Sequence, residues 1–559
     1  MVDLKTYEGE NLTGQPWQVY PRPQMRRDSF LNLNGEWKFS VNYGYSGTIM
    51  VPFCPECQLS GVNKHFPEGA SLVYHKTLDL PEGFNRGRVL LHIGAVDQKA
   101  DIFMNRKKIF HHEGGYEAFT VDITDGLGEG NELTIWTTDS LYDRQYPYGK
   151  QTLKRGGMWY TPVSGIWQTV WLESVPQTYI HKLNIENRGA SVTISTEPAL
   201  NGKVNVNGLG EYALEDGTVT ITPDTPHFWS PEDPYLYDFT VEAGEDRVES
   251  YFALRTLEIK KIGNYQRLCL NGKPFFFHGL LDQGYWPDGL FTPAAPECYA
   301  NDILAMKRLG FNTLRKHIKV EPEEFYYQCD KLGMIVFQDM VNNGKYSFFH
   351  DTALPTVGIQ KLNDKKMHTD PATRDAFLWG MEATVNQLKN HPCILYWTIF
   401  NEGWGQFDSD NVYHHLKAMD DTRWIDSTSG WFRQTETDVD SRHVYFKPIK
   451  LKAGEKPLVL SEFGGYSFKP EGHVFNTEQT YGYGKFEDQN AFADAVEKLY
   501  REQVIPAVKN GLCAAIYTQV SDVEDETNGL LSYDRKAAKL TPERMIPIAN
   551  ALRNALTER

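Results

Sequence analysis

The stretch Cys393–Asp408 reads CILYWTIFNEGWGQFD. Its apolar run, Ile394–Phe400, ends abruptly in Asn401 and Glu402. A continuous apolar run of this length is typical of a strand buried in a parallel sheet. The stretch therefore predicts a buried strand with one carboxylate at its carboxyl end, followed directly by glycine and tryptophan residues.

The length and composition of the chain indicate a soluble globular protein of several domains. Its 559 residues exceed one ordinary hydrophobic core, and predict about three or four domains. Hydrophobic residues make up 41% and charged residues 23% of the chain, as in globular proteins. The net charge of −16 argues against nucleic acid or an anionic membrane as the main partner, because both require clustered Lys and Arg.

The N-terminal sequence MVDLKTYEGENLTGQPW has no basic start followed by an apolar stretch, so we expect no secretory signal and a cytoplasmic protein. No run of about eighteen apolar residues occurs, so we expect no membrane span. The seven cysteines are expected to be reduced and mostly buried. Cys54 and Cys57 form a C-x-x-C without a second pair or a histidine cluster, so we expect no metal site there.

Two β-rich domains are predicted before residue 257. Residues 1–177 contain many short strand-like runs between turns, including GEWKFSV, GRVLLHIGAV and GIWQTVWLES, which predict a jelly-roll β-sandwich. Residues 178–256 continue in shorter form with KLNIENRG, SVTISTE and GTVTITPD. Their length and spacing predict a small immunoglobulin-like sandwich.

In residues 257–559 apolar runs alternate with helical segments, which predicts a parallel sheet. The eight strand candidates are PFFFHGL, NTLRKHI, MIVFQDM, CILYWTIFN, RWIDSTSG, RHVYFKP, PLVLSEF and LCAAIYTQV. Eight such strands in one domain fit a (β/α)₈ barrel. The polar segment Val341–Pro371, between the third and fourth strands, is too long for an ordinary connection. It is predicted to be either a lid or binding loop, or a solvated surface insertion.

A second carboxylate closes another strand of this barrel. The sequence KPLVLSEFGGYS presents Glu462 before two glycines, so Glu402 and Glu462 end strands four and seven. Active sites of such barrels lie at the carboxyl ends of the strands. Two carboxylates in different environments suit glycoside hydrolysis, where one delivers a proton to the leaving oxygen and the other meets the anomeric carbon.

The sequences NEGWG and SEFGG, each after an apolar strand and behind two sandwich domains, resemble glycoside hydrolase family 2. That family contains β-galactosidases, β-glucuronidases and β-mannosidases. FLNLNGEWKFS, SGIWQTVWLE, NGKPFFFHG and NHPCILYWTIFNE are similar to stretches of the family, so the resemblance covers nearly the whole chain. It implies a retaining exo-acting β-glycosidase that needs no cofactor and acts on a carbohydrate.

The resemblance assigns roles to five residues. Glu402 would be the general acid/base and Glu462 the nucleophile. Asn401 would bond the sugar 2-hydroxyl, Arg315 would hold the nucleophile ionised, and Tyr445 would orient the same carboxylate. Other interpretations stay open, because Arg315 could simply pair with an aspartate and Tyr445 could pack in the barrel.

Five further residues are candidate substrate contacts. Trp404 and Trp431 could stack on sugar faces, or could fill a core. Asp282 and Gln283 stand where the family often carries Asn and His at the end of the first strand, and Gln519 follows the eighth strand. These departures bear on the sugar more than on the reaction.

The sugar itself stays open. The chain offers only Asp339 where large β-galactosidases carry a Glu and His magnesium pair, so we predict no essential metal. DETNGLLSYDRK lacks the Asn-x-Lys of β-glucuronidases, although Lys316, His317 or Lys319 could pair with a uronate. We favour a neutral sugar, with β-galactoside first and a β-glucuronide, another uronate or a mannoside as alternatives. The remaining alternative for the function is a non-catalytic carbohydrate-binding protein. For the assembly, a homo-oligomer stays open.

Overall fold

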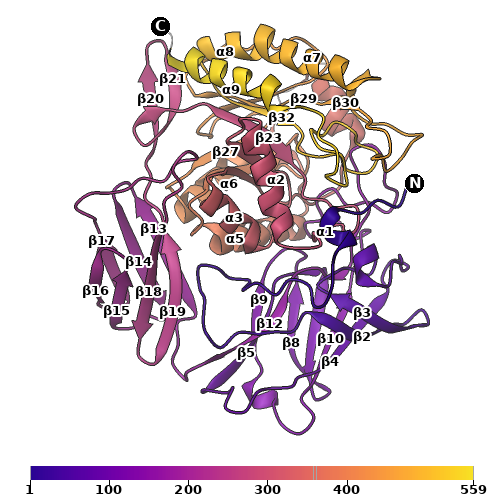
Figure 1. Cartoon of the computed structure of the whole chain (residues 1–559), viewed down its shortest axis with the longest axis vertical. Coiled ribbons are helices and arrows are strands. Elements are labelled where there is room, and N and C mark those ends of the chain that lie inside the picture. The colour runs from indigo at the N-terminus through magenta and orange to yellow at the C-terminus, as the bar shows by residue number, and fades with distance from the viewer. Residues whose placement is uncertain (1, 357, 360–361, 558–559) are drawn as a thin grey trace.

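The computed structural model describes residues 2–356, 358–359 and 362–557 (Figure 1). It confirms the predicted fold class, a multidomain, mostly β chain with an eight-stranded parallel barrel. The N-terminal sandwich lies below the barrel in Figure 1, the second sandwich lies to its left, and the C-terminal helices cover its top.

The N-terminal sandwich consists of two antiparallel sheets, ordered β1-β12-β5-β9 and β3-β2-β4-β10-β7-β8. The strands of the first sheet are β1 (Leu31–Asn32), β12 (Val170–Val175), β5 (Arg88–Ile93) and β9 (Phe119–Asp122). Those of the second are β3 (Tyr45–Val51), β2 (Gly35–Val41), β4 (Ser71–Thr77), β10 (Glu132–Thr138), β7 (Lys99–Met104) and β8 (Lys107–Glu113). Buried and exposed residues alternate along β2, which places Trp37, Phe39 and Val41 in the core between the sheets.

The second sandwich has its own hydrophobic core, separate from that of the first. Its sheets are β13 (Lys182–Arg188), β14 (Ser191–Glu197) and β17 (Thr218–Ile221), and β16 (Gly210–Leu214), β15 (Gly202–Val206), β18 (Tyr237–Ala243) and β19 (Asp246–Phe252). A small sheet of β20 (Leu257–Ile262), β21 (Tyr265–Leu270) and β22 (Lys273–Pro274) precedes the barrel. The domain boundaries at 177/178 and 256/257 stay a prediction.

All eight predicted barrel strands form, in the order β27-β26-β25-β24-β23-β32-β29-β28. They are β23 (Phe277–Asp282), β24 (Thr313–Lys316), β25 (Ile335–Asp339), β26 (Ile394–Asn401), β27 (Trp424–Ser429), β28 (Asp440–Val444), β29 (Leu458–Gly464) and β32 (Leu512–Thr518). Every residue of β26 is buried, as its apolar sequence predicts. The apolar part of this strand therefore fixes the backbone from which Asn401 and Glu402 emerge.

The helices of the barrel are α2 (Glu297–Arg308), α3 (Glu323–Leu332), α5 (Pro371–Leu388), α6 (Ser409–Met419), α7 (Gln489–Leu499), α8 (Ile505–Lys509) and α9 (Pro542–Thr557). The connections β27–β28 and β28–β29, described in full, carry no helix. After β29, a pair of short strands, β30 (Tyr466–Phe468) and β31 (Tyr483–Phe486), precedes α7. Loops rather than helices therefore link β27, β28 and β29, where the second carboxylate lies.

The long segment 341–371 contains a π-helical turn (Phe348–Ala353), the short helix α4 (Leu354–Thr356) and a 3-10 turn (Asp364–Lys366). Residues 357, 360 and 361 of the predicted lid lie outside the described residues. Whether the segment moves as a lid stays a prediction. All seven cysteines are free and buried, as expected. Within the described ranges no helix has both the length and the apolar character needed to cross a membrane.

Candidate active site

The carboxyl end of β26 turns sharply at the first predicted glutamate. Glu402 has a positive φ of 53°, which is uncommon outside glycine and is found at functional sites. Its N–H donates to the carbonyl of Ser429 at 2.9 Å. Gly403 follows with φ 75°, and a Cβ there would lie 2.4 Å from the ring of Phe432. The glycine is therefore required to turn the chain away directly behind the carboxylate.

The two predicted glutamates face each other. A carboxylate oxygen of Glu402, one of Glu462 and a ring nitrogen of His443 all lie within 4.8 Å of one another. The environments differ, because the Glu402 side chain is 24% exposed and that of Glu462 is 6% exposed. A single site thus contains one carboxyl group open to a ligand and one enclosed by protein.

Glu462 is held as an anion. Arg315 Nη1 donates to its Oε1 at 3.1 Å, and the Tyr445 hydroxyl donates to its Oε2 at 2.7 Å. Burial opposes ionisation, but His443, Arg315, His317 and the Tyr445 hydroxyl together lower the pKa of Glu462 to about 2. This carboxylate is therefore ionised across the neutral range.

Arg315 is the hub of the hydrogen bonds below the site. Its side chain is buried, and its Nε donates to Asp339 Oδ1 at 2.9 Å. Nη1 donates to the carbonyl of Ser461 as well as to Glu462, and Nη2 donates to Asn401 Oδ1 at 2.8 Å. The pairing with an aspartate and the contact with the second glutamate therefore coexist. Because Oδ1 of Asn401 accepts from Arg315, the amide N–H groups of Asn401 remain to bind a ligand.

His443 is a site residue that the sequence reasoning missed. The pairing of β28 with β29 skips Ser461, so His443 lies opposite Glu462. Its side chain is fully buried, and Nδ1 lies 2.7 Å from Glu402 Oε1 and 3.5 Å from Glu462 Oε2. The available signal was the spacing in RHVYF, since residues two apart on a strand share a face and Tyr445 was already a candidate.

The two candidate tryptophans have different surroundings. Trp404 is 4% exposed, and its ring contacts those of Tyr148, Trp159 and Tyr346 at centroid distances of 5.5, 4.8 and 5.7 Å. It is thus part of an aromatic cluster that joins the first domain to the barrel. Trp431 lies edge-on to His443 at 5.6 Å, and its buried Nε1 has no hydrogen-bond partner among the described residues. Trp431 therefore keeps a donor for a ligand.

The remaining candidates are buried. Asp282 accepts from Lys316 Nζ at 2.7 Å and from the N–H of Gly284, so its charge is neutralised inside the barrel. The Oε1 atoms of Gln283 and Gln519 are buried and lack partners among the described residues. The Nε2 of Gln519 donates to Asn528 at 2.8 Å. The role of these three residues as substrate contacts stays a prediction.

The three cations considered for a uronate already have partners. Lys316 also donates to Glu321 Oε1 at 2.9 Å, and Lys319 donates to the same oxygen at 3.0 Å. Nδ1 of His317 lies 2.8 Å from Asp339 Oδ2. Burial, the main influence, lowers the pKa of Lys319 to about 8 despite the charge of Glu321. All three side chains are therefore committed to internal contacts.

A loop of the first domain reaches the mouth of the barrel. The N–H groups of Tyr148 and Gly149 donate to the carbonyl of Asn342, just after β25. The hydroxyl of Tyr160 donates to Glu526, in the loop after β32. Lys150, between these anchors, is half-buried, and its amine forms no hydrogen bond or ion pair with any described residue. No feature of the amino-acid sequence predicts that this loop lies beside a site more than 150 residues away.

Comparison with known protein families gives two matches in this chain. The description "Glycosyl hydrolases family 2, TIM barrel domain" matches residues 260–539, and "Glycosyl hydrolases family 2" matches residues 175–255. The chain belongs to glycosyl hydrolases family 2. The sequence-based resemblance is therefore confirmed at the level of the family.

Relatives within family 2 carry different names. The chain is 25% identical to a beta-galactosidase of Thermoanaerobacter pseudethanolicus, over 71% of this chain and 54% of the relative. It is 25% identical to human beta-glucuronidase, over 63% of this chain and 58% of the relative. The chain thus spans little more than half the length of these curated relatives. The fold resembles that of an uncultured Clostridium sp. beta-glucuronidase, with a TM-score of 0.73, 18% identity and coverage of 97% and 100% of the two chains.

The cluster of Glu402, His443 and Glu462 in this family 2 chain also has donor atoms of a kind that bind divalent metals. However, the guanidinium of Arg315 contacts Glu462 at 3.1 Å. This fixed positive charge opposes a cation between the carboxylates. The guanidinium of Arg315 therefore makes this cluster a poor fit for a divalent cation.

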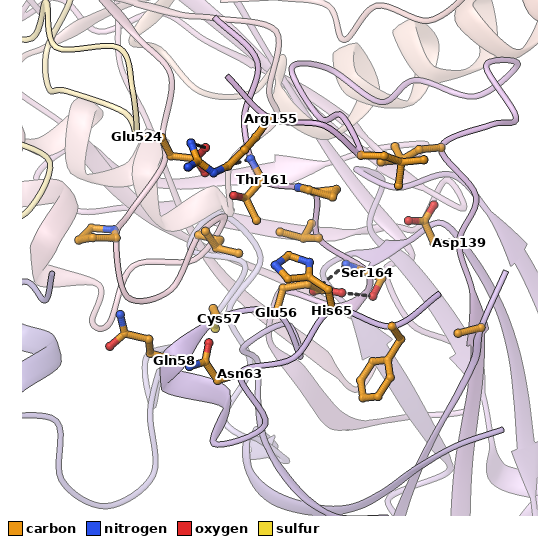
Figure 2. Close-up of a pocket in the computed structure, with 18 of the residues that line it drawn as sticks. Glu56, Cys57, Gln58, Asn63, His65, Asp139, Arg155, Thr161, Ser164 and Glu524 are labelled. Carbon is orange, nitrogen blue, oxygen red and sulfur yellow. Dashed lines mark hydrogen bonds and ion pairs between the residues drawn. The ribbon is translucent and has the colours of Figure 1, made fainter. Parts of the chain in front are cut away.

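A separate cavity of about 520 Å³ lies between the first domain and the loops of the barrel. Figure 2 shows Glu56, Cys57 and His65 beside it, with Arg155 and Glu524 on one side and Asp139 on the other. Burial raises the pKa of Glu56 to about 8, although bonds from Ser164 act in the opposite direction. Neither catalytic candidate lines this cavity. It is therefore distinct from the site at the strand ends.

Proposed function

We propose that this chain is a retaining, exo-acting β-glycosidase that cleaves terminal β-linked sugars. The observation that carries the proposal is the pair formed by Glu402 and Glu462, whose oxygens lie within 4.8 Å of each other. Carboxyl groups about 5 Å apart belong to the retaining mechanism, whereas inverting enzymes leave room for a water between them.

In the first step, Glu462 attacks the anomeric carbon while Glu402 gives its proton to the leaving oxygen. The glycosidic bond breaks and a glycosyl ester of Glu462 forms. In the second step, a water gives its proton to Glu402 and its oxygen attacks the anomeric carbon, which releases Glu462 as a carboxylate. The low pKa of Glu462 and the more open position of Glu402 support these roles.

The supporting residues act on the nucleophile and the sugar. Arg315 and Tyr445 hold Glu462 ionised and in one orientation through the two bonds described above. Asn401, whose oxygen is fixed by Arg315, is proposed to donate its amide N–H to the sugar 2-hydroxyl. That bond strengthens as charge develops on the ring in the transition state.

The first candidate sugar is a β-galactoside. Lys316, His317 and Lys319 have internal partners, so none of them is available to a sugar carboxylate without breaking a buried contact. Family 2 relatives named beta-galactosidase are consistent with this candidate.

The second candidate is a β-glucuronide, and Lys150 is the observation that favours it. This amine lacks a hydrogen-bond or ion-pair partner among the described residues. Burial raises the pKa of Glu526, and the charge of Lys150 acts on that carboxyl in the opposite direction. The charge of Glu462 acts on the same group, so Lys150 and the nucleophile border one region. Lys150 could supply the cation that a uronate requires. Several structural neighbours are named beta-glucuronidase.

A non-catalytic carbohydrate-binding protein is the alternative from another class. Binding alone gives no reason to keep one carboxylate at a pKa of about 2 beside a second, half-open carboxyl group. Fold does not establish activity, so only an assay separates the two classes.

The test is a panel of nitrophenyl β-glycosides that includes the galactoside, glucuronide and mannoside. We expect hydrolysis of at least one, its loss in Glu462→Gln, and no change in Glu471→Gln, an exposed glutamate of the same barrel. A 2-fluoro sugar that traps the ester should label Glu462, as read by peptide mass spectrometry. Hydrolysis that survives in Glu462→Gln would reject the mechanism, and the lack of both turnover and label would reject the function.

A further inference from the structure

One histidine contacts both carboxyl groups of the proposed pair. His443 is fully buried, with Nδ1 at 2.7 Å from Glu402 Oε1 and 3.5 Å from Glu462 Oε2. On the far side of the ring, Nε2 lies 3.0 Å from the Ser429 hydroxyl and 3.4 Å from Arg315 Nη1. The shorter contact, to Glu402, is of hydrogen-bond length.

The neighbours of the ring assign its tautomer. Arg315 can only donate, so the nitrogen that faces it, Nε2, has to be an acceptor. The ring proton therefore lies on Nδ1, where it points at Glu402 Oε1.

The backbone is shaped to allow this contact. Gly430 has a φ of 89°, and a Cβ at that position would lie 2.7 Å from Nδ1 of His443. Any other residue would push the ring away from Glu402. Because the pairing of β28 with β29 skips Ser461, His443 and Glu462 lie opposite each other in the barrel. Two separate features of the chain thus place this ring.

We propose that His443 is a positioning residue that decides which oxygen of Glu402 carries the catalytic proton. Its Nδ1–H occupies Oε1 as an acceptor, so the proton that Glu402 delivers lies on Oε2. When that proton moves to the leaving oxygen, the same Nδ1–H stabilises the new carboxylate. The inference rests on the proposed function, and it deepens the role of Glu402.

Other groups also face this pair and affect its titration. They are Arg315 on β24, Asp426 on β27, Glu462 on β29, Tyr445 after β28, Tyr346 and Asp351 of segment 341–371, and Tyr481 and Tyr483 before and within β31. Because His443→Ala and His443→Asn leave all of these unchanged, a difference between the two variants reports on the Nδ1–H donor.

The test compares His443→Ala with His443→Asn, whose amide N–H can replace the ring Nδ1–H. Without the donor, Glu402 holds its proton to higher pH. We expect the alkaline limb of kcat/KM to move up by about one pH unit in His443→Ala. His443→Asn should restore it. His415→Ala is the matched control, because His415 pairs with Glu382 at 2.8 Å on the outer helices. Its profile should equal the wild type.

A second measurement does not depend on turnover. The carboxyl carbon of Glu402, labelled with 13C and assigned with Glu402→Gln, should titrate at higher pH in His443→Ala than in the wild type and His443→Asn. An unchanged midpoint in His443→Ala would overturn the inference, even if the wild type hydrolyses glycosides. A shifted midpoint in a protein that cleaves no glycoside would instead reject the proposed function and leave the contact standing.

Discussion

The hydroxyl of Tyr445 donates a 2.7 Å hydrogen bond to Oε2 of Glu462. Arg315 bonds the other oxygen, Oε1, at 3.1 Å, so both oxygens of this carboxylate have donors. Such bonds favour the charged form and fix its plane. Glu462 of β29 is therefore held in one orientation by Arg315 of β24 and by Tyr445, just after β28.

Replacement of Tyr445 by phenylalanine removes one donor and keeps the ring. A hydrogen bond to a charged group contributes about 1.5–3 kcal/mol, so we expect kcat to fall by about 10- to 100-fold. The check is steady-state kinetics on the best nitrophenyl glycoside. Tyr413→Phe removes a 2.7 Å bond to Asp438 near α6 and should leave kcat unchanged. Equal kinetics in both variants would contradict the role of Tyr445.

Loss of the acid/base should depend on the leaving group. In Glu402→Ala we expect kcat/KM to fall by about 10²- to 10⁴-fold for a nitrophenyl glycoside. A dinitrophenyl glycoside should be far less affected, because its leaving group needs no proton. Azide, which fits beside the shortened side chain, should restore turnover and give a β-glycosyl azide, seen by NMR. An α-glycosyl azide would show inversion instead of the proposed retention.

Most of the barrel was predictable because its strands are continuous apolar runs that end in polar residues. The eight residues of β26 are all buried, and the same logic located β29 and Glu462. The connections were less predictable, because β27–β28 and β28–β29 have no helix. A sequence in which strands alternate with helices does not show which of the connecting helices the folded barrel lacks.

The candidate site was predicted in part, and the missed residues reach it through a register shift or through packing between domains. His443 reaches the carboxylates because a register shift skips Ser461, and such a shift leaves no trace in residue types. Lys150 and Trp159 come from the first domain, and only packing brings Trp159 within 4.8 Å of the Trp404 ring. Asp282 was a candidate contact on position alone, yet its charge is paired with Lys316.

Glu56 should make stability depend on pH. Its pKa is raised to about 8, mainly by burial, against about 4.3 in an unfolded chain. The carboxyl of Glu56 therefore stays protonated to higher pH in the folded state than in the unfolded state. The stability that this proton provides is present below about pH 4.3 and is lost as pH rises through about 8. We expect Glu56→Gln to raise Tm at pH 9 by several degrees and to have little effect at pH 5.

Differential scanning fluorimetry across pH 5–9 checks this prediction. The control is Glu129→Gln, an exposed glutamate of the same sandwich, whose Tm should follow the wild type at every pH. A constant difference between Glu56→Gln and the wild type would mean that the carboxyl does not titrate in this range.

Replacement of Lys150 by methionine should separate the two candidate sugars. Methionine keeps most of the length of the side chain and removes its charge. If this amine pairs with a uronate, kcat/KM for a nitrophenyl β-glucuronide should fall by about 10- to 100-fold, the value of a charge-assisted bond. The β-galactoside carries no charge, so its kcat/KM should stay within about 3-fold, less than one neutral hydrogen bond.

The matched control is Lys154→Met, an exposed lysine of the same first-domain loop. It should leave the ratio of the two kcat/KM values unchanged. A wild type that cleaves only the galactoside would exclude the uronate role. An equal fall in kcat/KM for both sugars in Lys150→Met would instead mean that the lysine stabilises its own first-domain loop, which contacts Asn342 and Glu526. The lysine would then not bind the charged group of the substrate.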